Sequence, residues 1–262
     1  MPIGFKPLLS KRKKILFLFL VVVFLLAGVF SLYIVFSLPD VSDLKKHNPK
    51  RTALIELRTK NAQKKRQTLT IRQQWISFHS IPQLLKDTVR ITEDASFYWH
   101  KGIDFEELKE SIKKNLEARR LVRGGSTITQ QLAKNLYLST EKSFVRKIKE
   151  YLIARRLEKT LSKDRIFEVY LNLIELGPGI FGVQAASEYY FGCDVSDLTL
   201  EQIVRLTSVI PRPLRTSPTG ESRWLKWKCR WILGKLRLYK YISDEEYAFL
   251  MEMFSTETPS NY

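Results

Sequence analysis

The apolar and polar residues of this 262-residue chain fall into two patterns. The first is an uncharged run over residues 15–38, ILFLFLVVVFLLAGVFSLYIVFSL. A helix rises about 1.5 Å per residue, so this run spans about 36 Å, against roughly 30 Å of bilayer hydrocarbon. We therefore predict one transmembrane helix over residues 15–38.

Charges on the two sides of this run predict its orientation. The sequence KRKK stands at 11–14, immediately before the run, whereas Asp40 and Asp43 follow it. The positive-inside rule makes residues 1–14 a cytoplasmic tail and places the rest of the chain outside. A cleaved signal peptide is the alternative, but such peptides have apolar cores of roughly 7–15 residues. The longer run favours an anchor that remains on the mature protein.

The second pattern is apolar spacing typical of helices, which begins after residue 80. Three pairs resemble capping boxes at helix starts: Asp104 with Glu107, Thr199 with Gln202, and Ser243 with Glu246. We expect helices from Pro82 to about residue 93, and over about 104–120, 126–138, 143–161, 164–175, 182–191, 199–210, 221–238 and 243–254. Only residues 70–78 resemble a strand, so the fold class is mainly α.

The composition indicates an anionic partner. Lys and Arg total 44 against 27 Asp and Glu, a formal net charge of +17. Nucleic acid, a phospholipid surface and a phosphate-bearing substrate all fit this charge. Only two cysteines are present, which excludes a disulfide framework and a Cys-rich zinc site. Residues 39–70 are predicted to be a basic juxtamembrane linker, either simply solvated or attracted to anionic lipid headgroups.

The expected helix over 126–138 has one apolar side and one polar side. Thr127, Gln130, Gln131 and Lys134 gather on the polar side, which carries no charge except Lys134. Gly124 and Gly125 precede the helix and could let backbone N–H groups approach an anion. An ordinary amphipathic helix with a solvated polar face is the alternative.

Two groups of charged residues could carry chemistry. Arg146, Lys147 and Glu150 lie within about one helical turn of each other. They could form ordinary surface salt bridges, or Glu150 could be a carboxylate among cations that bind an anionic ligand. Glu93 and Asp94 are adjacent at the expected end of a helix, where a carboxylate holds a proton more readily. This suits a general base, although a solvated acid pair is also common.

Four segments, in order, resemble the motifs of the family 51 glycosyltransferases, the peptidoglycan polymerases. They are EDASFYWHKGID at 93–104, GGSTITQQLAKN at 124–135, RKIKE at 146–150 with YLN at 170–172, and GIFG at 179–182 with YFG at 190–192. The fifth motif, over 203–211, departs from the family pattern. The motifs of a penicillin-binding transpeptidase are not found, so the chain resembles the monofunctional branch.

The resemblance implies a mainly α, lysozyme-like glycosyltransferase domain over residues 71–262, with a smaller membrane-embedded lobe. It implies polymerisation of lipid II into β-1,4 glycan with inversion and release of undecaprenyl pyrophosphate. Glu93 would be the general base. Glu150 would be a second essential carboxylate near the leaving pyrophosphate, or a ligand of a divalent cation there, Mg²⁺ or Mn²⁺. No tightly held structural metal is expected.

The resemblance also implies roles for the other motif residues. Lys134, Arg146 and Lys147 would neutralise pyrophosphate charge, and Asp94 and His100 would orient Glu93. The full set of expected substrate-binding residues is Asp94, Phe97, His100, Ser126, Thr127, Gln130, Gln131, Lys134, Asn135, Lys142, Arg146 and Lys147. The donor site would also bind the pyrophosphate-lipid inhibitor moenomycin.

Two other functions fit part of the sequence. A lysozyme-like glycan hydrolase would need two acids but no phosphate-binding cluster, and a membrane-tethered, non-enzymatic glycan-binding protein would not need Glu93. Nucleic-acid binding fits the charge but not the topology. The expected partners are lipid II, the growing glycan chain, membrane phospholipid, and proteins of cell-wall synthesis or division. The expected location is the cytoplasmic (inner) membrane, with the catalytic domain on its outer face.

Overall fold

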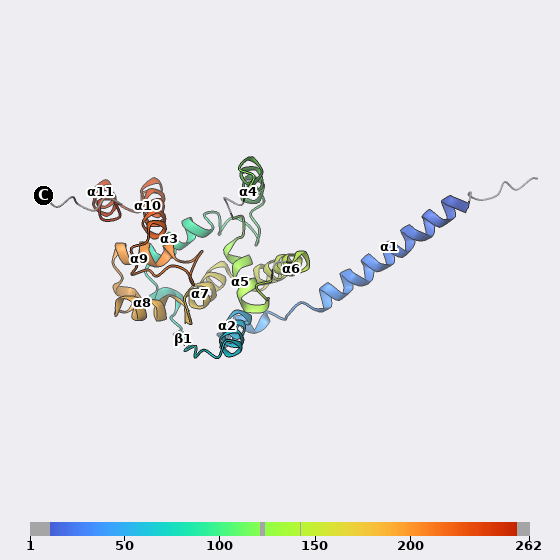
Figure 1. Cartoon of the computed structure of the whole chain (residues 1–262), viewed down its shortest axis with the longest axis horizontal. Coiled ribbons are helices and arrows are strands. Elements are labelled where there is room, and N and C mark those ends of the chain that lie inside the picture. The colour runs from blue at the N-terminus through green and yellow to red at the C-terminus, as the bar shows by residue number, and fades with distance from the viewer. Residues whose placement is uncertain (1–10, 121–123, 142, 256–262) are drawn as a thin grey trace, which may run out of the picture. The chain divides into compact units, whose positions relative to one another are not determined.

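The computed structural model describes residues 11–120, 124–141 and 143–255, in two compact units, 1–39 and 40–262. The first unit contains helix α1 (Lys11–Phe36), the long blue helix in Figure 1. Within the described residues, Lys13–Phe36 is the one helix long and apolar enough to cross a membrane. The candidate span thus begins and ends two residues before the predicted one.

The second unit is mainly α, as predicted. Its helices are α2 (Ala53–Lys64), α3 (Gln83–Glu93), α4 (Phe105–Glu117), α5 (Ile128–Tyr137), α6 (Phe144–Thr160), α7 (Lys163–Leu173), α8 (Val183–Phe191), α9 (Leu200–Ser208), α10 (Arg223–Leu238) and α11 (Asp244–Met253). Short 3-10 turns lie at Ser42–Lys45, Phe78–Ser80 and Val195–Asp197.

The helix starts follow the polar caps in the sequence. Full capping boxes begin α9 at Thr199 and α11 at Ser243, as expected. Asp104 caps α4 by accepting from the backbone N–H of Glu107 at 2.8 Å. The cap of α5 is Thr127, one residue after the predicted start at Ser126, because Thr127 pairs with Gln130 in a further box.

A small three-stranded sheet interrupts the helices. Strand β3 (Ile180–Phe181) lies between β1 (Arg72–Gln73), to which it is parallel, and β2 (Glu175–Gly177), to which it is antiparallel. The predicted strand over 70–78 is therefore real but only two residues long. The predicted helix over 164–175 ends earlier, since α7 stops at Leu173 and residue 175 belongs to β2.

The basic segment at 39–70 is not a linker, which corrects that prediction. It contains α2, whose Leu54 and Ile55 pack against Phe181 in a small core. Arg58 donates from Nε and Nη2 to the two oxygens of buried Glu175, both at 2.7 Å. A bidentate pair of this kind fixes α2 on the sheet, so the folded unit begins well before residue 71.

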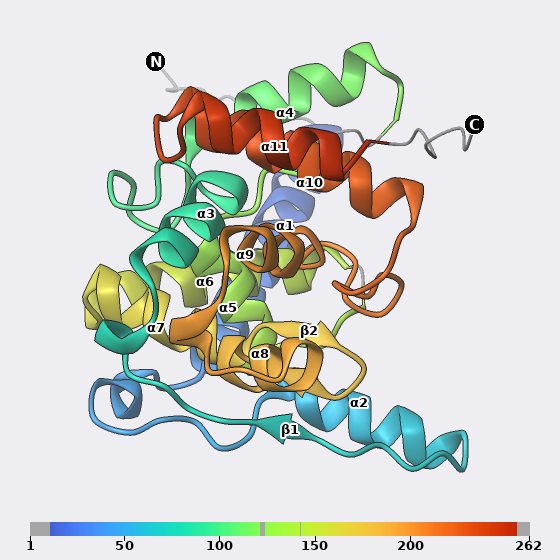
Figure 2. The same cartoon turned by 90° about the vertical axis from the view of Figure 1, so that its left-hand side faces the viewer.

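Helix α5 lies at the centre of the second unit. It packs against α6, α7 and α2, and Ile128, Leu132 and Ala133 on its apolar side are fully buried, as predicted. A second group of helices lies beside it, in which α10 packs against α3, α9 and α11 (Figure 2). Helix α3 belongs to the second group, and Asp94 at its end accepts from the N–H of Ile128 at the start of α5, so the end of α3 lies between the two groups.

Helix α4 lies at one edge of the unit in both views (Figures 1 and 2). Its apolar residues Phe105, Leu108, Ile112 and Leu116 are 65%, 37%, 52% and 73% exposed. They recur every three or four residues and therefore form one stripe along the helix. An exposed apolar stripe of this length marks an interaction surface. The smaller membrane-embedded lobe stays a prediction.

Candidate active site

Glu93 is the last residue of α3, and its half-buried carboxylate is held by a neutral amide. Gln131 donates from Nε2 to Glu93 Oε2 at 3.0 Å, and the Tyr170 hydroxyl donates to Gln131 Oε1 at 3.0 Å. Burial raises the pKa of Tyr170 well above its ordinary value, so its hydroxyl remains a donor. No described residue donates to Glu93 Oε1, which leaves that oxygen able to accept a substrate proton.

Asp94 joins the end of α3 to the start of α5. Its buried carboxylate accepts from His100 Nε2 at 2.9 and 3.0 Å and from the backbone N–H of Ile128 at 3.0 Å. The positive end of the α5 dipole favours this negative charge. Asp94 therefore holds Glu93 and Gln131, which lie on different helices, at a fixed separation.

His100 fixes the loop that follows α3. Its Nδ1 accepts from the backbone N–H of Gly102 at 3.1 Å, so the ring proton lies on Nε2, where it is donated to Asp94. Gly102 has φ +91°, and its carbonyl accepts from the Thr127 hydroxyl at 2.8 Å. Asp94 and His100 thus fix the loop that follows Glu93, and the role in orienting Glu93 that the family resemblance implies for them stays a prediction.

Phe97 lies in the core, which corrects its predicted contact with substrate. Its ring is fully buried against Phe167, with the ring centroids 5.4 Å apart, and Lys163 Nζ lies 4.4 Å from its centroid. A buried ring has no surface for a substrate, so Phe97 anchors the loop. The next two residues are exposed: Tyr98 to 45% and Trp99 to 89%.

Three backbone N–H groups at the start of α5, those of Thr127, Ile128 and Gln130, are used within the protein. Thr127 and Gln130 are buried and bond each other in the capping box, which uses their own N–H groups. The N–H of Ile128 is bonded to Asp94. Thr127 and Gln130 therefore hold the helix start, and the anion at this helix end is the protein's own carboxylate.

Glu150 is the centre of a cationic cluster. It is 3% exposed, and it accepts from Arg146 Nη1 and Lys147 Nζ, both at 2.5 Å. Lys147 also donates to the hydroxyl of exposed Ser126 at 3.0 Å, which links α6 to the segment before α5. Arg146 Nε is buried and has no hydrogen-bond partner among the described residues.

Lys134 lies within the electrostatic field of both carboxylates. Burial lowers its pKa, the cations Arg146 and Lys147 lower it further, and Glu150 and Glu93 raise it. An anionic ligand beside Lys134 would therefore stabilise its charged form. Asn135, on the same helix, is 9% exposed. Lys142 lies outside the described residues.

The residues around Glu150 do not fit a divalent cation held by protein ligands. Both carboxylate oxygens already bond to cations, and Mg²⁺ or Mn²⁺ requires several oxygen ligands. No group of three or more His, Cys, Asp or Glu that could hold a metal occurs among the described residues. The predicted divalent cation stays a prediction, and we derive no step through it.

Comparison with known proteins identifies the family. Residues 60–237 match the transglycosylase family. A biosynthetic peptidoglycan transglycosylase of Nitrosospira multiformis is 41% identical over 189 residues, 72% of this chain and 82% of that protein. The chain belongs to the transglycosylase family.

Two further relatives carry the same name. The protein of Nitrosomonas eutropha is 40% identical over 212 residues, which are 81% of this chain and 87% of that protein. The protein of Alcanivorax borkumensis is 38% identical over 222 residues, 85% of this chain and 86% of that protein. The prediction of a glycosyltransferase with a lysozyme-like domain is confirmed at the level of the family.

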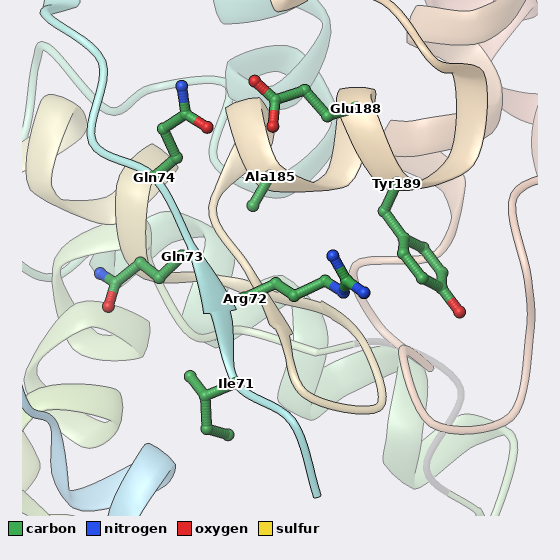
Figure 3. A pocket seen from close by; sticks show the side chains of 7 residues that line it. All are labelled: Ile71, Arg72, Gln73, Gln74, Ala185, Glu188 and Tyr189. Carbon is green, nitrogen blue, oxygen red and sulfur yellow. The ribbon is translucent and has the colours of Figure 1, made fainter.

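One described cavity of this transglycosylase lies apart from the predicted site residues. It has a volume of about 310 Å³ and is lined by β1 and α8 residues, among them Arg72, Glu188 and Tyr189 (Figure 3). None of the predicted site residues lines it. This cavity therefore does not mark the residues that the motifs identify.

Sequence reasoning missed the contribution of α10 to the site. Lys235 donates from Nζ to the carbonyl of Ile91, two residues before Glu93, at 2.8 Å. Lys228, on the same helix, interacts electrostatically with Glu93. The basic, Trp-rich composition of residues 221–238 was visible in the sequence. Which of its lysines faces Glu93 depends on how α10 packs against α3.

Proposed function

We propose that this transglycosylase polymerises lipid II into peptidoglycan glycan strands. Glu93 removes the proton from the 4-hydroxyl of the acceptor N-acetylglucosamine. That oxygen forms a bond to the anomeric carbon of the N-acetylmuramic acid at the end of the growing chain. The bond from this carbon to the pyrophosphate breaks on the opposite face, and its electron pair leaves with the lipid pyrophosphate. The product is a β-1,4 linkage with inversion.

The observation that carries this proposal is the contrast between the two carboxylates. Glu93 is held by one neutral amide and keeps an oxygen without a donor among the described residues. Glu150 is nearly fully buried, and each of its oxygens bonds a cation. The first arrangement suits a base that gains a proton. The second suits a carboxylate that positions cations for another anion.

The cationic cluster is the proposed site for the leaving pyrophosphate. Arg146 and Lys147 are held together by Glu150, and Lys134 lies close enough for all three to affect its pKa. As the anomeric bond breaks, negative charge grows on the phosphate oxygens. Cations fixed there before the reaction stabilise that charge without having to reorganise. A glycan hydrolase has no such charge to neutralise, which disfavours that alternative.

The exposed apolar residues suit a substrate carried on a lipid. The apolar stripe of α4, with exposed Trp99 in the loop before it, is proposed to enter the outer leaflet. Helix α1 would anchor the chain with its N-terminus in the cytoplasm and the catalytic unit on the outer face. Both features would keep the second unit next to lipid II.

The test is an assay of the purified full chain with two substrates. Incubation with lipid II should give long glycan strands and release undecaprenyl pyrophosphate, and finished glycan should stay intact. Glu252→Gln, an exposed residue on α11, serves as the matched control and should polymerise at the wild-type rate. Cleavage of finished glycan without polymer growth would instead establish a hydrolase.

A further inference from the structure

The cavity between β1 and α8 is lined mainly by polar side chains. Its volume is about 310 Å³, and five of its seven lining residues are polar: Arg72, Gln73, Gln74, Glu188 and Tyr189. The other two, Ile71 and Ala185, supply a small apolar surface. Sites for small ligands have volumes of about 300–1,000 Å³, so this cavity has room for a small molecule or a short segment of a polymer.

Several hydrogen-bonding groups of this cavity are not used by the protein. The Arg72 side chain makes no hydrogen bond and no ion pair with the described residues, and its guanidinium carbon lies 5.4 Å from the centroid of the Tyr189 ring (Figure 3). Glu188 accepts from Gln184 Nε2 at 2.8 Å through Oε1, and no described residue donates to its Oε2. The side-chain amide of exposed Gln74 likewise has no partner within the described chain.

These groups favour a polar ligand with little net charge. The charges of Arg72 and Glu188 cancel, so the cavity does not attract a multiply charged phosphate. A lipid chain would bury both charges without replacing their bonds to water, which costs free energy. Hydroxyl groups both donate and accept, and amide groups carry a donor and an acceptor, so they match a cavity that holds unused donors beside unused acceptors.

Tyr189 adds an apolar surface to this polar lining. Its side chain is 55% exposed, and the guanidinium of Arg72 lies over the ring. A flat ring beside hydrogen-bonding groups can pack against the C–H groups of a sugar while the hydroxyl and N-acetyl groups of that sugar are hydrogen-bonded. The lining therefore points to a saccharide.

The place of the cavity in the second unit also favours a glycan. In both views β1 and α8 lie on the opposite side of this unit from α4 (Figures 1 and 2). Because the exposed apolar stripe of α4 is proposed to enter the membrane, the cavity then faces away from the bilayer. That is the side on which a glycan strand extends as it grows.

Asn172 connects one wall of the cavity to the candidate active site. Gln73 donates from Nε2 to the carbonyl of Asn172 at 3.3 Å, and the Asn172 side chain bonds the N–H and the carbonyl of Ile76 at 2.8 and 2.9 Å. Asn172 lies two residues after Tyr170, which reaches Glu93 through Gln131. The cavity and Glu93 are therefore held by the same helix, α7.

We propose that this cavity is a second saccharide site, which binds N-acetylated sugar residues of a peptidoglycan glycan strand away from the reacting end. The inference rests on the proposed polymerisation of lipid II. Arg72 donates to an N-acetyl carbonyl, Glu188 accepts from hydroxyl groups, and the Tyr189 ring packs against a sugar. The same chemistry recognises the strand that the enzyme is making and a finished strand of the wall.

The first test is binding of a neutral hexamer of β-1,4-linked N-acetylglucosamine to the full chain in detergent, with excess moenomycin to fill the donor site. The wild type should bind it saturably, and Arg72→Ala, Gln74→Leu and Tyr189→Ala should each weaken binding about 2–10-fold. Tyr239→Ala and Arg223→Ala, exposed positions on or next to α10, are the matched controls and should bind as the wild type does.

Two results of this test overturn the proposal. One is the absence of saturable binding to the wild type, or equal binding by the wild type and all three cavity variants. The other is a loss confined to Arg72→Ala, which would show a single contact and not a saccharide site. All three positions are exposed, so wild-type Tm is expected. Gln74→Leu keeps nearly the same size and decides the matter if another variant does not fold.

The second test distinguishes the two sources of glycan. If the cavity holds the growing strand, Tyr189→Ala should make shorter strands from lipid II at an unchanged initial rate. If it holds the finished wall, Tyr189→Ala should make strands of wild-type length but sediment less with insoluble peptidoglycan. A variant that matches the wild type in both strand length and sedimentation overturns the proposal.

These tests also separate the cavity from the proposed function. A wild type that makes no polymer from lipid II rejects the proposed function, whereas binding of the hexamer requires no reaction and is scored independently. A wild type that polymerises, with cavity variants that bind the hexamer as tightly as it does, rejects the second site alone.

Discussion

Replacement of Asp94 by Asn removes the negative charge that accepts the hydrogen bonds of this network. The Asp94 carboxylate accepts from His100 Nε2 and from the N–H of Ile128. An Asn oxygen in the place of Oδ2 could still accept from both donors, but both hydrogen bonds would then end on a neutral amide, and the NH₂ group in the place of Oδ1 would face His100 Nε2–H. If the ring proton of His100 moved from Nε2 to Nδ1, the Nδ1–H group would face the backbone N–H of Gly102, so His100 cannot adapt by changing its tautomer.

The size of this effect follows from burial. Hydrogen bonds to charged groups contribute about 1.5–3 kcal/mol, against about 0.5–1.5 kcal/mol for hydrogen bonds between neutral groups, and Asp94 accepts from two donors. We expect Asp94→Asn to lower the free energy of unfolding by about 2–3 kcal/mol. For a domain of this size that lowers Tm by about 4–12 °C. Because Asp94 also sets the separation of Glu93 and Gln131, polymerisation should fall about 10–100-fold.

Tm and lipid II polymerisation of the full chain in detergent measure the two effects. Asp197→Asn is the matched control, because Asp197 is exposed, and it should leave Tm and rate unchanged. A folded Asp94→Asn variant with wild-type Tm and wild-type rate would show that the hydrogen bonds between α3 and α5 do not position Glu93.

Three further predictions concern the cluster, the lobe and the anchor. Lys134→Ala should sharply lower the rate of polymerisation and keep Tm within about 2 °C of wild type, because Lys134 does not lie on the apolar side of α5. A wild-type rate, or an unfolded protein, would contradict the proposed contact of Lys134 with pyrophosphate. Ile112→Asp changes a half-exposed position on α4. It should weaken binding of the full chain to vesicles that contain lipid II, as measured by flotation, without lowering Tm. Unchanged binding would contradict membrane contact by α4. Sequencing of the mature N-terminus should find residues 15–38 retained, and a start beyond residue 27 would show a cleaved signal peptide.

The helices and their caps could be predicted from the sequence because both are local. Thr199 with Gln202 and Ser243 with Glu246 form the expected boxes, and the apolar side of α5 is buried. The boundary at residue 71 was wrong because α2 carries few apolar residues. Its attachment depends on Arg58 meeting Glu175, which lies 117 residues further along the chain.

The sequence could predict which residues form the candidate site, but not which part each residue plays in it. Polarity suggested that Thr127 and Gln130 face a ligand, whereas both are used to begin α5. Phe97 lies in a motif beside exposed aromatic residues, yet its ring is in the core. Tyr170 on α7 donates to Gln131 on α5, which in turn donates to Glu93, and the spacing of residues in a sequence carries no signal for such contacts.

The two carboxylates also predict different effects on an inhibitor. Glu150→Gln should weaken binding of moenomycin, because Glu150 holds Arg146 and Lys147 in place. Glu93→Gln should bind it as the wild type does, since Glu93 lies outside that cluster. Equal affinity in the two variants would contradict this division of roles.

The rate of lipid II polymerisation by Glu93→Gln tests the central claim most directly. Gln keeps the size of the side chain and its contact with Gln131, but it cannot take a proton at neutral pH. The account predicts a folded variant that binds moenomycin at wild-type affinity and polymerises at least about 100-fold more slowly. Substantial polymerisation by this folded variant would contradict the assignment of Glu93 as the general base.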